Sequence, residues 1–564
     1  MRWTVWRGSL PEPADMRFWG WGRDGHPSVL PEHALGFLAD RLGSLGRRRA
    51  PVELEQVQLP PSRLAGADGQ VLSEVVGPDG LAVDHRTRVL HCGGKGYPDL
   101  VRLRSGHPDY APDAVLFPGD AAAVGRLLRC SAERDLAVVP FGGGTSVVGG
   151  LRPEPGSHRG VISLDLRRLD AIGRPDRESR LIRVGGGVRV AALEQCLASG
   201  GLTLGHFPQS YEYVTVGGCA ATRSAGQASS GYGRFDDMVV GLRFASPDGE
   251  LDLAATPASA AGPDLRELVL GSEGALGVIT DVTLGIRPAP PARRYEGVFF
   301  ETFAAGCEAL RALAELDGRP DVLRLSDESE TEQSIALSAS HGIRDALGQG
   351  YLRLRGVGGG CLAIIGFDGG EAGVRARRAR SVSVLRRLGA VVIGQSPGRS
   401  WLQSRFSGPY LRDDLLDRGV MVETLETAAT WSELLGLRRA VADAISSALQ
   451  ARGTPGLVMC HVSHVYRTGA SLYFTFLARQ QDGDELTQWR AVKSAASAAI
   501  VGHRATITHH HAVGRDHRPY LAGEIGRTGV GVLRALKREL DPGAVMNPGV
   551  LVPLPGEDQP AEPS

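Results

Sequence analysis

The chain has 564 residues, of which 42% are hydrophobic, and it carries 63 basic and 63 acidic side chains. This length predicts two to four domains with packed cores. The balanced, interspersed charge excludes the basic stripe of a nucleic-acid-binding protein. The seven cysteines are scattered without a CxxC pair, so neither a disulfide framework nor a cysteine-based zinc site is expected. No secretory leader or membrane-spanning run stands out, which favours a cytoplasmic protein.

Residues 1–109 have mixed polarity and predict a helical or capping segment. They contain an aromatic–glycine cluster, Phe18-Trp-Gly-Trp-Gly22, and a helical stretch from about Pro31 to Leu45. Tryptophan clusters can mark interfaces with other molecules, because their rings bury large areas. A segment that packs on a neighbouring domain of the same chain is the favoured interpretation.

A regular α/β pattern starts at Ala114. Ala114–Phe117 predicts a short strand, Asp120 can cap the helix that follows, and Leu136–Val139 predicts the next strand. A turn rich in glycine comes next, Pro140-Phe-Gly-Gly-Gly-Thr-Ser146. Glycines allow positive φ and close approach of the backbone to a ligand, and successive N–H groups with the two hydroxyls can bind a phosphate.

A glycine triplet alone is weak evidence, because 76 glycines in 564 residues make about one triplet expected by chance. The continuation is more informative. A P-loop would lead through Lys-Ser or Lys-Thr into a helix, and a Rossmann motif also opens a helix. Here Val147–Gly160 is rich in glycine and proline, and the chain returns as a strand at Val161–Leu166. The turn is therefore predicted to hold a dinucleotide pyrophosphate between two strands.

A second α/β unit follows, with a strand at Leu181–Val184. The hydroxyl- and glycine-rich stretch 206–233 suits backbone wrapped around a large flat ligand. A hairpin turns at Ser246-Pro-Asp-Gly249, and Leu270–Thr280 gives another close-approach loop before a strand that ends at Arg287-Pro288. Loops of this length inside one domain are usually functional.

From residue 289 onwards, strands alternate with helices. Cys361–Phe367 and Ala390–Ile393 predict strands on either side of an arginine-studded helix, Gly370–Leu388. Leu457–Tyr466 and Ser471–Leu477 predict a hairpin. This pattern suits one sheet covered by helices.

Four motifs, in this order and at regular spacing, resemble the FAD-binding domain of the vanillyl-alcohol-oxidase-type flavoproteins. They lie at Pro140–Ser146, Gln209–Gly218, Thr222–Gly226 and Gly271–Thr280, and the tail Leu540–Gly549 resembles the general ending of that superfamily.

Within the superfamily, the chain resembles the alkyldihydroxyacetonephosphate synthase family from about Phe18 to Val552. The motifs that carry this resemblance are Tyr410-Leu-Arg-Asp-Asp414, Gly469-Ala-Ser-Leu-Tyr-Phe-Thr-Phe476 and Thr508-His-His-His-Ala-Val-Gly514.

The resemblance implies an α+β fold. A two-subdomain FAD-binding domain would span residues 110–288, and an α/β cap domain, an antiparallel sheet covered by helices, would span 289–505. Residues 506–553 would return to the flavin, and 554–564 would form a disordered tail.

The resemblance also implies FAD as the cofactor. Non-covalent binding is expected, because no His or Cys lies beside the glycine turn in the sequence and His206 is the nearest candidate. The residues expected to bind FAD are Pro140, Phe141, Gly142, Gly143, Gly144, Thr145, Ser146, Gln209, Ser210, Thr215, Gly217, Gly218, Thr222, Ser224, Ala225, Glu273, Gly274, Ala275, Leu276, Gly277, Val278 and Ile279.

On the second hairpin strand, alternation places Leu472, Phe474 and Phe476 on the core face and Tyr473 on the opposite face. The pattern alone is compatible with an ordinary packing tyrosine. The position matches the catalytic tyrosine of the resembled family, which implies that Tyr473 acts as acid and base.

His509, His510 and His511 lie in a run that predicts extended backbone, with His509 and His511 on one side and His510 on the other. Three interpretations compete: a metal site, structural histidines bonded to carbonyls, and a cluster that binds phosphate and transfers protons. No Cys or Glu nearby in the sequence completes a metal-ligand set, so no metal is predicted. The resemblance favours the third interpretation.

Arg412 lies beside Asp413 and Asp414 and could form an ion pair on a helix surface, but the resemblance assigns it to the phosphate of the substrate. Arg223 lies among small residues expected to wrap the flavin, and we expect it to be buried and to stabilise negative charge on the reduced ring. Ala512 stands where the family motif has Gly, which would strain the loop if positive φ is needed there.

The implied reaction exchanges the acyl group of acyl-dihydroxyacetone phosphate for a long-chain alcohol, through an adduct at flavin N5 and without net oxidation. Two alternatives remain: an FAD-dependent 2-hydroxyacid dehydrogenase, whose Gly-Glu-His-Gly motif lacks its Glu here, and a non-catalytic flavin-binding protein.

A lipid substrate and the N-terminal aromatic cluster favour peripheral membrane contact, and a homodimer is expected. The ending Glu-Pro-Ser does not predict a peroxisomal address.

Overall fold

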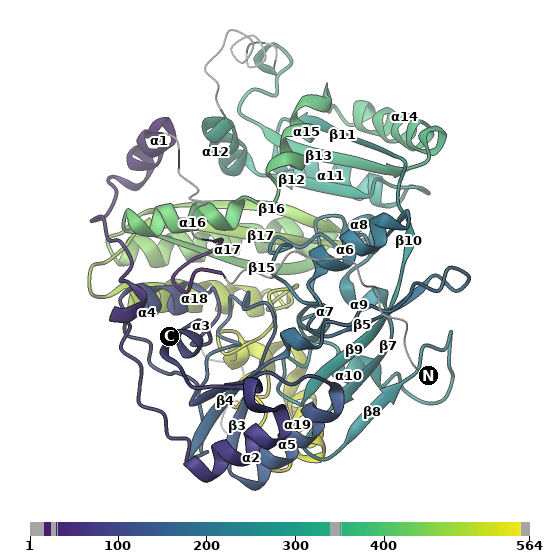
Figure 1. The fold of residues 1–564 in the computed structure, drawn as a ribbon. Helices are drawn as coiled ribbons and strands as arrows, with labels where there is room; N and C mark the ends of the chain where they lie inside the picture. The colour runs from purple at the N-terminus through teal and green to yellow at the C-terminus, as the bar shows by residue number, and fades with distance from the viewer. Residues whose placement is uncertain (1–15, 24–29, 31, 339–349, 351, 554–564) are drawn as a thin grey trace.

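The computed structural model describes the chain except residues 1–15, 24–29, 31, 339–349, 351 and 554–564, and the described residues form four β-sheets (Figure 1). The predicted tail 554–564 and part of the predicted N-terminal segment therefore lie outside the described residues. The α+β class expected from the sequence is confirmed, since one sheet is largely parallel and the largest sheet is antiparallel.

The first sheet contains the predicted α/β unit. Its strand order is β1-β2-β4-β3, with β2, β4 and β3 parallel. Asp120 caps the following helix as predicted, because its carboxylate accepts a hydrogen bond from the backbone N–H of Ala123. The elements are α2 (Gly66–Val76), β1 (Leu81–Ala82), α3 (His85–Leu90), α4 (Tyr97–Arg104), β2 (Ala114–Leu116), α5 (Ala121–Glu133), β3 (Leu136–Phe141) and β4 (Gly160–Asp165).

The second sheet is antiparallel, with the order β5-β9-β7-β8. A separate two-stranded antiparallel ribbon is formed by β6, which lies between β5 and β7 in the sequence, and β10, which follows β9. Short helices connect these strands. The elements are β5 (Leu181–Gly185), α6 (Val190–Ser199), β6 (Leu202–Thr203), α7 (Val216–Ala221), α8 (Ser229–Tyr232), α9 (Phe235–Met238), β7 (Val239–Ala245), β8 (Glu250–Leu253), α10 (Arg266–Val269), β9 (Val278–Gly285) and β10 (Arg287–Pro288).

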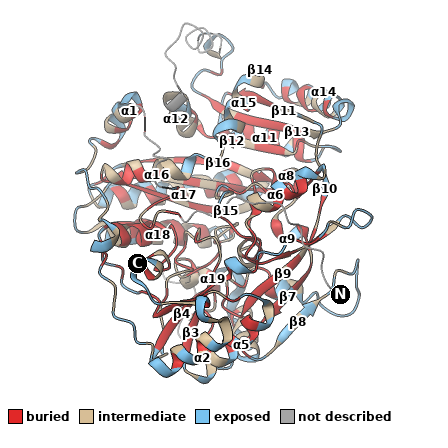
Figure 2. Ribbon diagram, in the orientation of Figure 1, coloured by how far each residue is buried: buried red, intermediate tan, exposed pale blue. Residues whose placement is uncertain are grey.

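The seven-stranded sheet of the cap is antiparallel throughout, with the order β14-β11-β13-β12-β16-β17-β15. Its strands are largely buried beneath helices whose outer faces are exposed (Figure 2). The elements are β11 (Ala292–Phe300), α11 (Phe303–Ala314), β12 (Val322–Ser326), α12 (Glu328–Ser338), β13 (Cys361–Gly369), α14 (Glu371–Arg387), β14 (Val391–Gly394), α15 (Gln395–Ser404), α16 (Gly408–Asp417), β15 (Val420–Thr430), α17 (Trp431–Ala451), β16 (Gly456–Val465), β17 (Gly469–Arg479) and α18 (Glu485–Gly502).

The C-terminal segment returns to the first sheet after α19 (Arg518–Leu540). Val138 on β3 donates a backbone hydrogen bond to Val545 and accepts one from Asn547, each of 2.8 Å. These bonds extend the edge of β3, so residues near the end of the described chain lie beside the strand that leads into the glycine turn.

The N-terminal aromatic cluster packs both on residues between 57 and 111, through Phe18, and on the cap, through Trp21. Phe18 and Trp21 are buried, and the backbone N–H of Trp21 donates to Asp413 at 2.9 Å. The helix expected near this cluster is α1 (Glu32–Leu42). The structure contradicts the use of Phe18 and Trp21 as exposed membrane anchors, because both rings are covered. None of the helices in the described residues is long and apolar enough to cross a lipid bilayer.

Candidate active site

A cavity of about 600 Å³ is lined both by loops of the FAD-binding region and by strands of the cap. Most of the residues expected to bind FAD contribute to its wall. They are Pro140, Phe141, Gly142, Gly143, Gly144, Thr145, Ser146, Gln209, Ser210, Thr215, Gly217, Gly218, Thr222, Ser224, Ala225, Glu273, Gly274, Gly277, Val278 and Ile279.

The glycine turn after β3 has no room for side chains. A Cβ on Gly143 would collide with the backbone oxygen of Tyr213, and one on Gly142 would collide with the Thr215 hydroxyl. Gly144 adopts a φ of 70°, which favours glycine. This wall is therefore bare backbone, which a phosphate or a flat ring can approach closely.

The loop around Glu273 ties the C-terminal segment to the same wall. Its carboxylate accepts hydrogen bonds from the backbone N–H groups of Val513 at 2.8 Å and Gly514 at 2.7 Å. Asn547 donates to the backbone oxygen of Glu273 at 2.9 Å. Burial raises the pKa of Glu273 to about 7, although the two N–H donors work against this shift. Glu273 thus fixes the loop that carries the three histidines.

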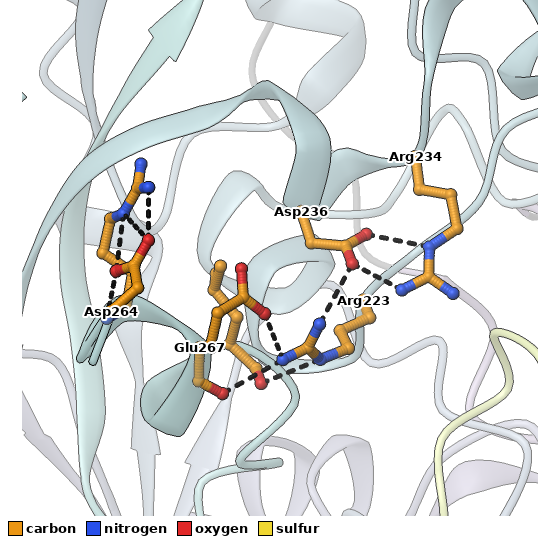
Figure 3. A network of polar contacts seen from close by, with 7 residues as sticks. Arg223, Arg234, Asp236, Asp264 and Glu267 are labelled. Carbon is orange, nitrogen blue, oxygen red and sulfur yellow. Dashed lines mark hydrogen bonds and ion pairs between the residues drawn. The ribbon is translucent and has the colours of Figure 1, made fainter. Parts of the chain in front are cut away.

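Four predicted site residues do not reach the cavity. Ala275 and Leu276 belong to the hydrophobic core, and His509 lies behind the wall. Arg223 is engaged elsewhere (Figure 3): its guanidinium pairs with Asp236 at 3.1 Å and with Glu267 at 2.7 Å.

The structure therefore contradicts the expected burial of Arg223 at the flavin. Its side chain is 32% exposed, and its backbone has a φ of 49°. Nε of Arg223 also donates to the backbone oxygen of Leu270 at 3.1 Å. The small neighbours of Arg223 in the sequence line the cavity, whereas its own side chain is held by acidic partners outside it.

Tyr473 on β17 faces the cavity, as the alternation predicted, while Leu472, Phe474 and Phe476 are fully buried on the other face. Its ring is stacked on His461 with centroids 4.8 Å apart, and the ring of His511 lies edge-on at 5.4 Å. Burial raises the pKa of the Tyr473 phenol to about 12, so the hydroxyl is protonated at neutral pH.

The sequence prediction missed a polar group next to Tyr473. Nδ1 of His461 lies 2.9 Å from Glu330, and Arg324 donates to the Glu330 carboxylate at 2.7 Å. Burial opposes ionisation of Glu330, but His461 and Arg324 hold its pKa at about 2. Arg324, Glu330 and His461 all line the cavity. The available signals were Arg324 between two leucines of an apolar strand and His461 in alternation with Ser463.

The histidines do not alternate as predicted, because residues 509–511 form consecutive bends and not a strand. His510 and His511 line the cavity. Burial and repulsion from His510 lower the pKa of His511 to about 3, so its imidazole is neutral. Ala512 adopts a positive φ of 75°. This is the position at which the family motif has Gly, so the alanine is strained there.

A second correction concerns the surroundings of His509 and His510. Both approach the buried carboxylate of Glu426 on β15, and His464 on β16 lies on the same carboxylate. Burial opposes ionisation of Glu426, but His510 and His509 hold its pKa well below the ordinary value. The fold thus supplies the Glu that the local sequence lacked.

Arg412 on α16 is buried and lines the cavity, so it is not the surface ion pair that its acidic neighbours allowed. Its guanidinium donates to the backbone oxygens of Lys95 at 3.1 Å and Val422 at 2.8 Å. Nε of Arg412 is buried without a hydrogen-bond partner among the described residues. The guanidinium also lies 3.5 Å from the buried carboxylate of Glu423, so its charge is already paired, while its unsatisfied Nε can still donate to an anion.

One thiol reaches the cavity although no Cys lies beside the glycine turn in the sequence. Cys219 on α7 lines the wall, and burial raises the pKa of its thiol to about 12. His206 is buried and is not part of the cavity lining. A neutral thiol is a weak nucleophile, which agrees with non-covalent cofactor binding.

Comparison with known proteins defines the class first. Residues 112–253 match the FAD binding domain, and residues 289–551 match the C-terminal domain of FAD linked oxidases. The chain is thus a flavoprotein of the FAD-linked oxidase type. It is 31% identical to alkyldihydroxyacetonephosphate synthase of Dictyostelium discoideum over 95% of this chain and 90% of that protein.

The homologous synthase of Trypanosoma brucei brucei is 32% identical over 89% of this chain and 83% of its own length. A solved alkyldihydroxyacetonephosphate synthase structure superposes with a TM-score of 0.82 at 28% identity, covering 96% of this chain and 99% of the other. The chain belongs to the alkyldihydroxyacetonephosphate synthase family.

The residues of the cavity fit FAD. Side-chain-free backbone at Gly142–Gly144 suits the pyrophosphate, and the loops at residues 209–225 and 273–279 give a long wall for the rest of the molecule. Gly217 packs against Gly186, where a Cβ would lie 2.9 Å from the backbone oxygen. The wall is thus shaped for a large cofactor that lies against backbone.

Proposed function

We propose that the protein is an FAD-dependent alkylglycerone-phosphate synthase, which exchanges the acyl group of acyl-dihydroxyacetone phosphate for a long-chain alcohol. One observation carries this proposal: a single cavity joins the bare glycine wall to Arg412, Tyr473, His510 and His511. The activity named for the relatives at 31% and 32% identity supports the same conclusion.

In this exchange, the bond between C1 and the ester oxygen breaks and the fatty acid leaves. A new bond forms between C1 and the alcohol oxygen, with no net oxidation. The bound FAD supplies the reactive ring on which the exchange depends. The protein must hold the phosphate, orient C1 and move protons from the alcohol and to the leaving group.

Arg412 is the residue that we assign to the substrate phosphate. Two of its guanidinium nitrogens donate to the backbone oxygens of Lys95 and Val422, which fixes the plane of the group. The third nitrogen, Nε, is buried and has no hydrogen-bond partner among the described residues. An arginine that is fixed before binding loses little entropy when it holds a phosphate. Charge-assisted hydrogen bonds of this kind are about twice as strong as neutral ones.

Tyr473 and His511 are the residues that we assign to proton transfer. The pKa of Tyr473 is raised to about 12 by burial, so its hydroxyl oxygen holds a proton to donate. The pKa of His511 is lowered to about 3 by burial, so its imidazole is neutral and has a free lone pair. Nδ1 of His511 is buried without a hydrogen-bond partner in the described residues. A protonated acid thus lies beside a neutral base.

The purified protein tests this proposal. It should have a flavin absorption spectrum and convert acyl-dihydroxyacetone phosphate and hexadecanol to the ether and free fatty acid without an electron acceptor. Bleaching of the flavin by D-lactate or a related 2-hydroxyacid, with no ether formed, would support the dehydrogenase alternative instead. A protein that binds flavin but neither forms ether nor is bleached by a 2-hydroxyacid would support a non-catalytic flavin-binding protein.

We also propose that the protein is a homodimer and that it makes peripheral contact with membranes; the lipid character of both substrates supports the membrane contact. Light scattering after gel filtration measures the first, and co-sedimentation with phosphatidylcholine vesicles measures the second. A monomer at micromolar concentration would contradict the dimer. Absence from the vesicle pellet would contradict membrane contact.

A further inference from the structure

Three imidazoles and one carboxylate converge at the cavity wall, where His464 and His510 line the cavity. They belong to Glu426 on β15, His464 on β16, and His509 and His510 on the loop between α18 and α19. Each residue offers one ligand atom, and these four atoms all lie within 4.8 Å of one another. Glu426, His464 and His509 are buried, and His510 is half-buried. Two strands and a loop, distant in the sequence, thus direct nitrogen and oxygen ligands at one point.

The separations match a tetrahedral metal site. Nδ1 of His509 lies 3.3 Å from Nδ1 of His510 and 3.4 Å from Oε1 of Glu426. A tetrahedron with metal–ligand bonds of about 2.05 Å has edges of about 3.3 Å. Nε2 of His464 lies 3.9 Å from the same carboxylate oxygen. Two of the six edges therefore already have about this length. Glu426 and His510 are in direct contact through the other carboxylate oxygen, and the four ligand atoms lie within 4.8 Å of one another, so a bound ion would separate His510 from the carboxylate and draw His464 inward.

Residues around the cluster would hold the ligands in place. The hydroxyl of Tyr466 lies 2.7 Å from Nε2 of His509, the ring nitrogen on the side away from the cluster. Ser463 donates to Oε1 of Glu426 at 2.9 Å. Histidines that bind metals almost always donate their other ring nitrogen to such a partner, and ligating carboxylates are themselves hydrogen-bonded.

We propose that Glu426, His464, His509 and His510 bind a divalent transition metal of the zinc class. Three imidazoles and one carboxylate suit zinc, copper, nickel or cobalt, whereas magnesium and calcium prefer sites made of oxygen ligands. The metal ion would be a second bound group beside FAD, and the proposed exchange reaction does not itself require it.

The metal would also set the proton position on His510. A neutral imidazole that binds metal through Nδ1 carries its proton on Nε2. Because His510 lines the cavity, it would then present an N–H donor to the substrate and not a base. His511 has no ligand atom in the cluster and would remain the proton acceptor. The metal would thus give two adjacent histidines different roles.

The metal content of the flavin-loaded protein tests this proposal. The protein should be purified without a histidine tag, because the tag itself binds transition metals, and its metals measured by plasma mass spectrometry. We expect about one zinc-class ion per chain. Removal with dipicolinate and addition of cobalt should produce visible ligand-field bands beyond the flavin spectrum.

Glu426→Gln and His464→Asn should each lower metal content at least about tenfold while FAD content is retained. His461→Asn is the matched control, because His461 lies on the same strand as His464 but outside the cluster; this variant should keep its metal. If a ligand variant does not fold, the cobalt titration of the wild-type protein remains a test.

A wild-type protein that holds no metal and takes up no cobalt would overturn the proposal. Metal that persists in both ligand variants would also overturn it. Ether synthesis, measured in the same preparations, separates this result from the proposed function: a metal-bound protein that forms no ether contradicts only the synthase assignment, and an active protein without metal contradicts only the metal site.

Discussion

The two walls of the cavity are built in opposite ways. The FAD-binding wall is rich in bare backbone, with glycines at 142–144 and 217 where side chains would collide. The cap wall is made of side chains: charged and aromatic ones such as Arg324, Arg412 and Tyr473 lie among aliphatic ones. The first wall recognises a ligand by shape and N–H groups, and the second places charge and protons. This difference implies that substitutions on the first wall remove the cofactor, whereas those on the second remove the reaction.

The largest effect is expected from Gly143→Ala. The added methyl group would collide with the backbone oxygen of Tyr213, so the turn must move and FAD should be lost together with all activity. FAD content, measured by absorbance after gel filtration, checks this. Gly249→Ala is the control, because nothing lies within 4 Å of the added atom. Full FAD content in Gly143→Ala would contradict the close-approach account of this wall.

Tyr473→Phe tests the opposite wall. It should retain FAD and lower kcat about 10²- to 10⁴-fold, because the phenol that exchanges a proton is removed. Steady-state rates of ether formation measure the effect. Tyr110→Phe, at an exposed tyrosine outside the cavity, should leave kcat unchanged. Wild-type turnover by the Tyr473 variant would refute the role of Tyr473.

Arg412→Lys should mainly raise KM for acyl-dihydroxyacetone phosphate. The compact ammonium of a lysine lacks the planar fork with which Arg412 reaches both backbone oxygens and points Nε at an anion, and losing a charge-assisted hydrogen bond costs about 1.5–3 kcal/mol, or about 10- to 100-fold in KM. FAD content should be unchanged. Arg375→Lys, at a side chain that is 70% exposed, serves as the control. An unchanged KM would show that Arg412 does not bind the phosphate.

Acid should lower the stability of the folded protein through His511, which lies on the C-terminal loop that lines the cavity. Its pKa is about 3 in the folded protein because of burial, below the ordinary value of 6.5. The unfolded chain therefore binds an extra proton below about pH 6.5, and the free energy of unfolding falls by about 1.4 kcal/mol per pH unit from this group. Above pH 6.5 the contribution vanishes.

His511→Asn should remove that slope between about pH 6.5 and 5, whatever constant change in stability it causes. Urea unfolding at several pH values measures the difference from wild type. His503→Asn, at an exposed histidine, should leave the slope intact. Parallel pH curves for wild type and His511→Asn would contradict the buried neutral state.

The smallest effect is expected from Ala512→Gly, where the two walls meet. Ala512 has a φ of 75°, and relief of this strain exceeds the entropy cost of glycine, so stability should rise by about 0.5–1 kcal/mol. Urea unfolding measures it. Ala228→Gly, where φ is −108°, should destabilise because there is no strain to relieve. A less stable Ala512→Gly variant would contradict the strain.

The sequence predicts the first wall well, because its residues are contiguous in short loops and their glycines carry a local signal. It also predicts the face of Tyr473, since strand alternation is local. The second wall could not be read in the same way. Arg324, Glu330 and His461 meet only because β12, α12 and β16 pack together, and Glu426 reaches the histidines across the sheet.

Arg223 shows the opposite failure. Small neighbours correctly placed its segment at the cavity, but a long side chain can leave the wall on which its backbone lies. Asp236 and Glu267 hold it outside, and Glu267 is far from it in the sequence. The motif therefore predicted where the backbone of Arg223 lies, but the partners of its side chain depend on the tertiary fold.

The central claim is that the cavity exchanges an acyl group for an alkoxy group at C1. Incubation of the flavin-loaded protein with acyl-dihydroxyacetone phosphate and hexadecanol labelled with heavy oxygen tests it most directly, with the products analysed by mass spectrometry and no electron acceptor present. The account predicts that the label is found in the ether and that one fatty acid is released for each ether formed. Fatty acid release without labelled ether would contradict it.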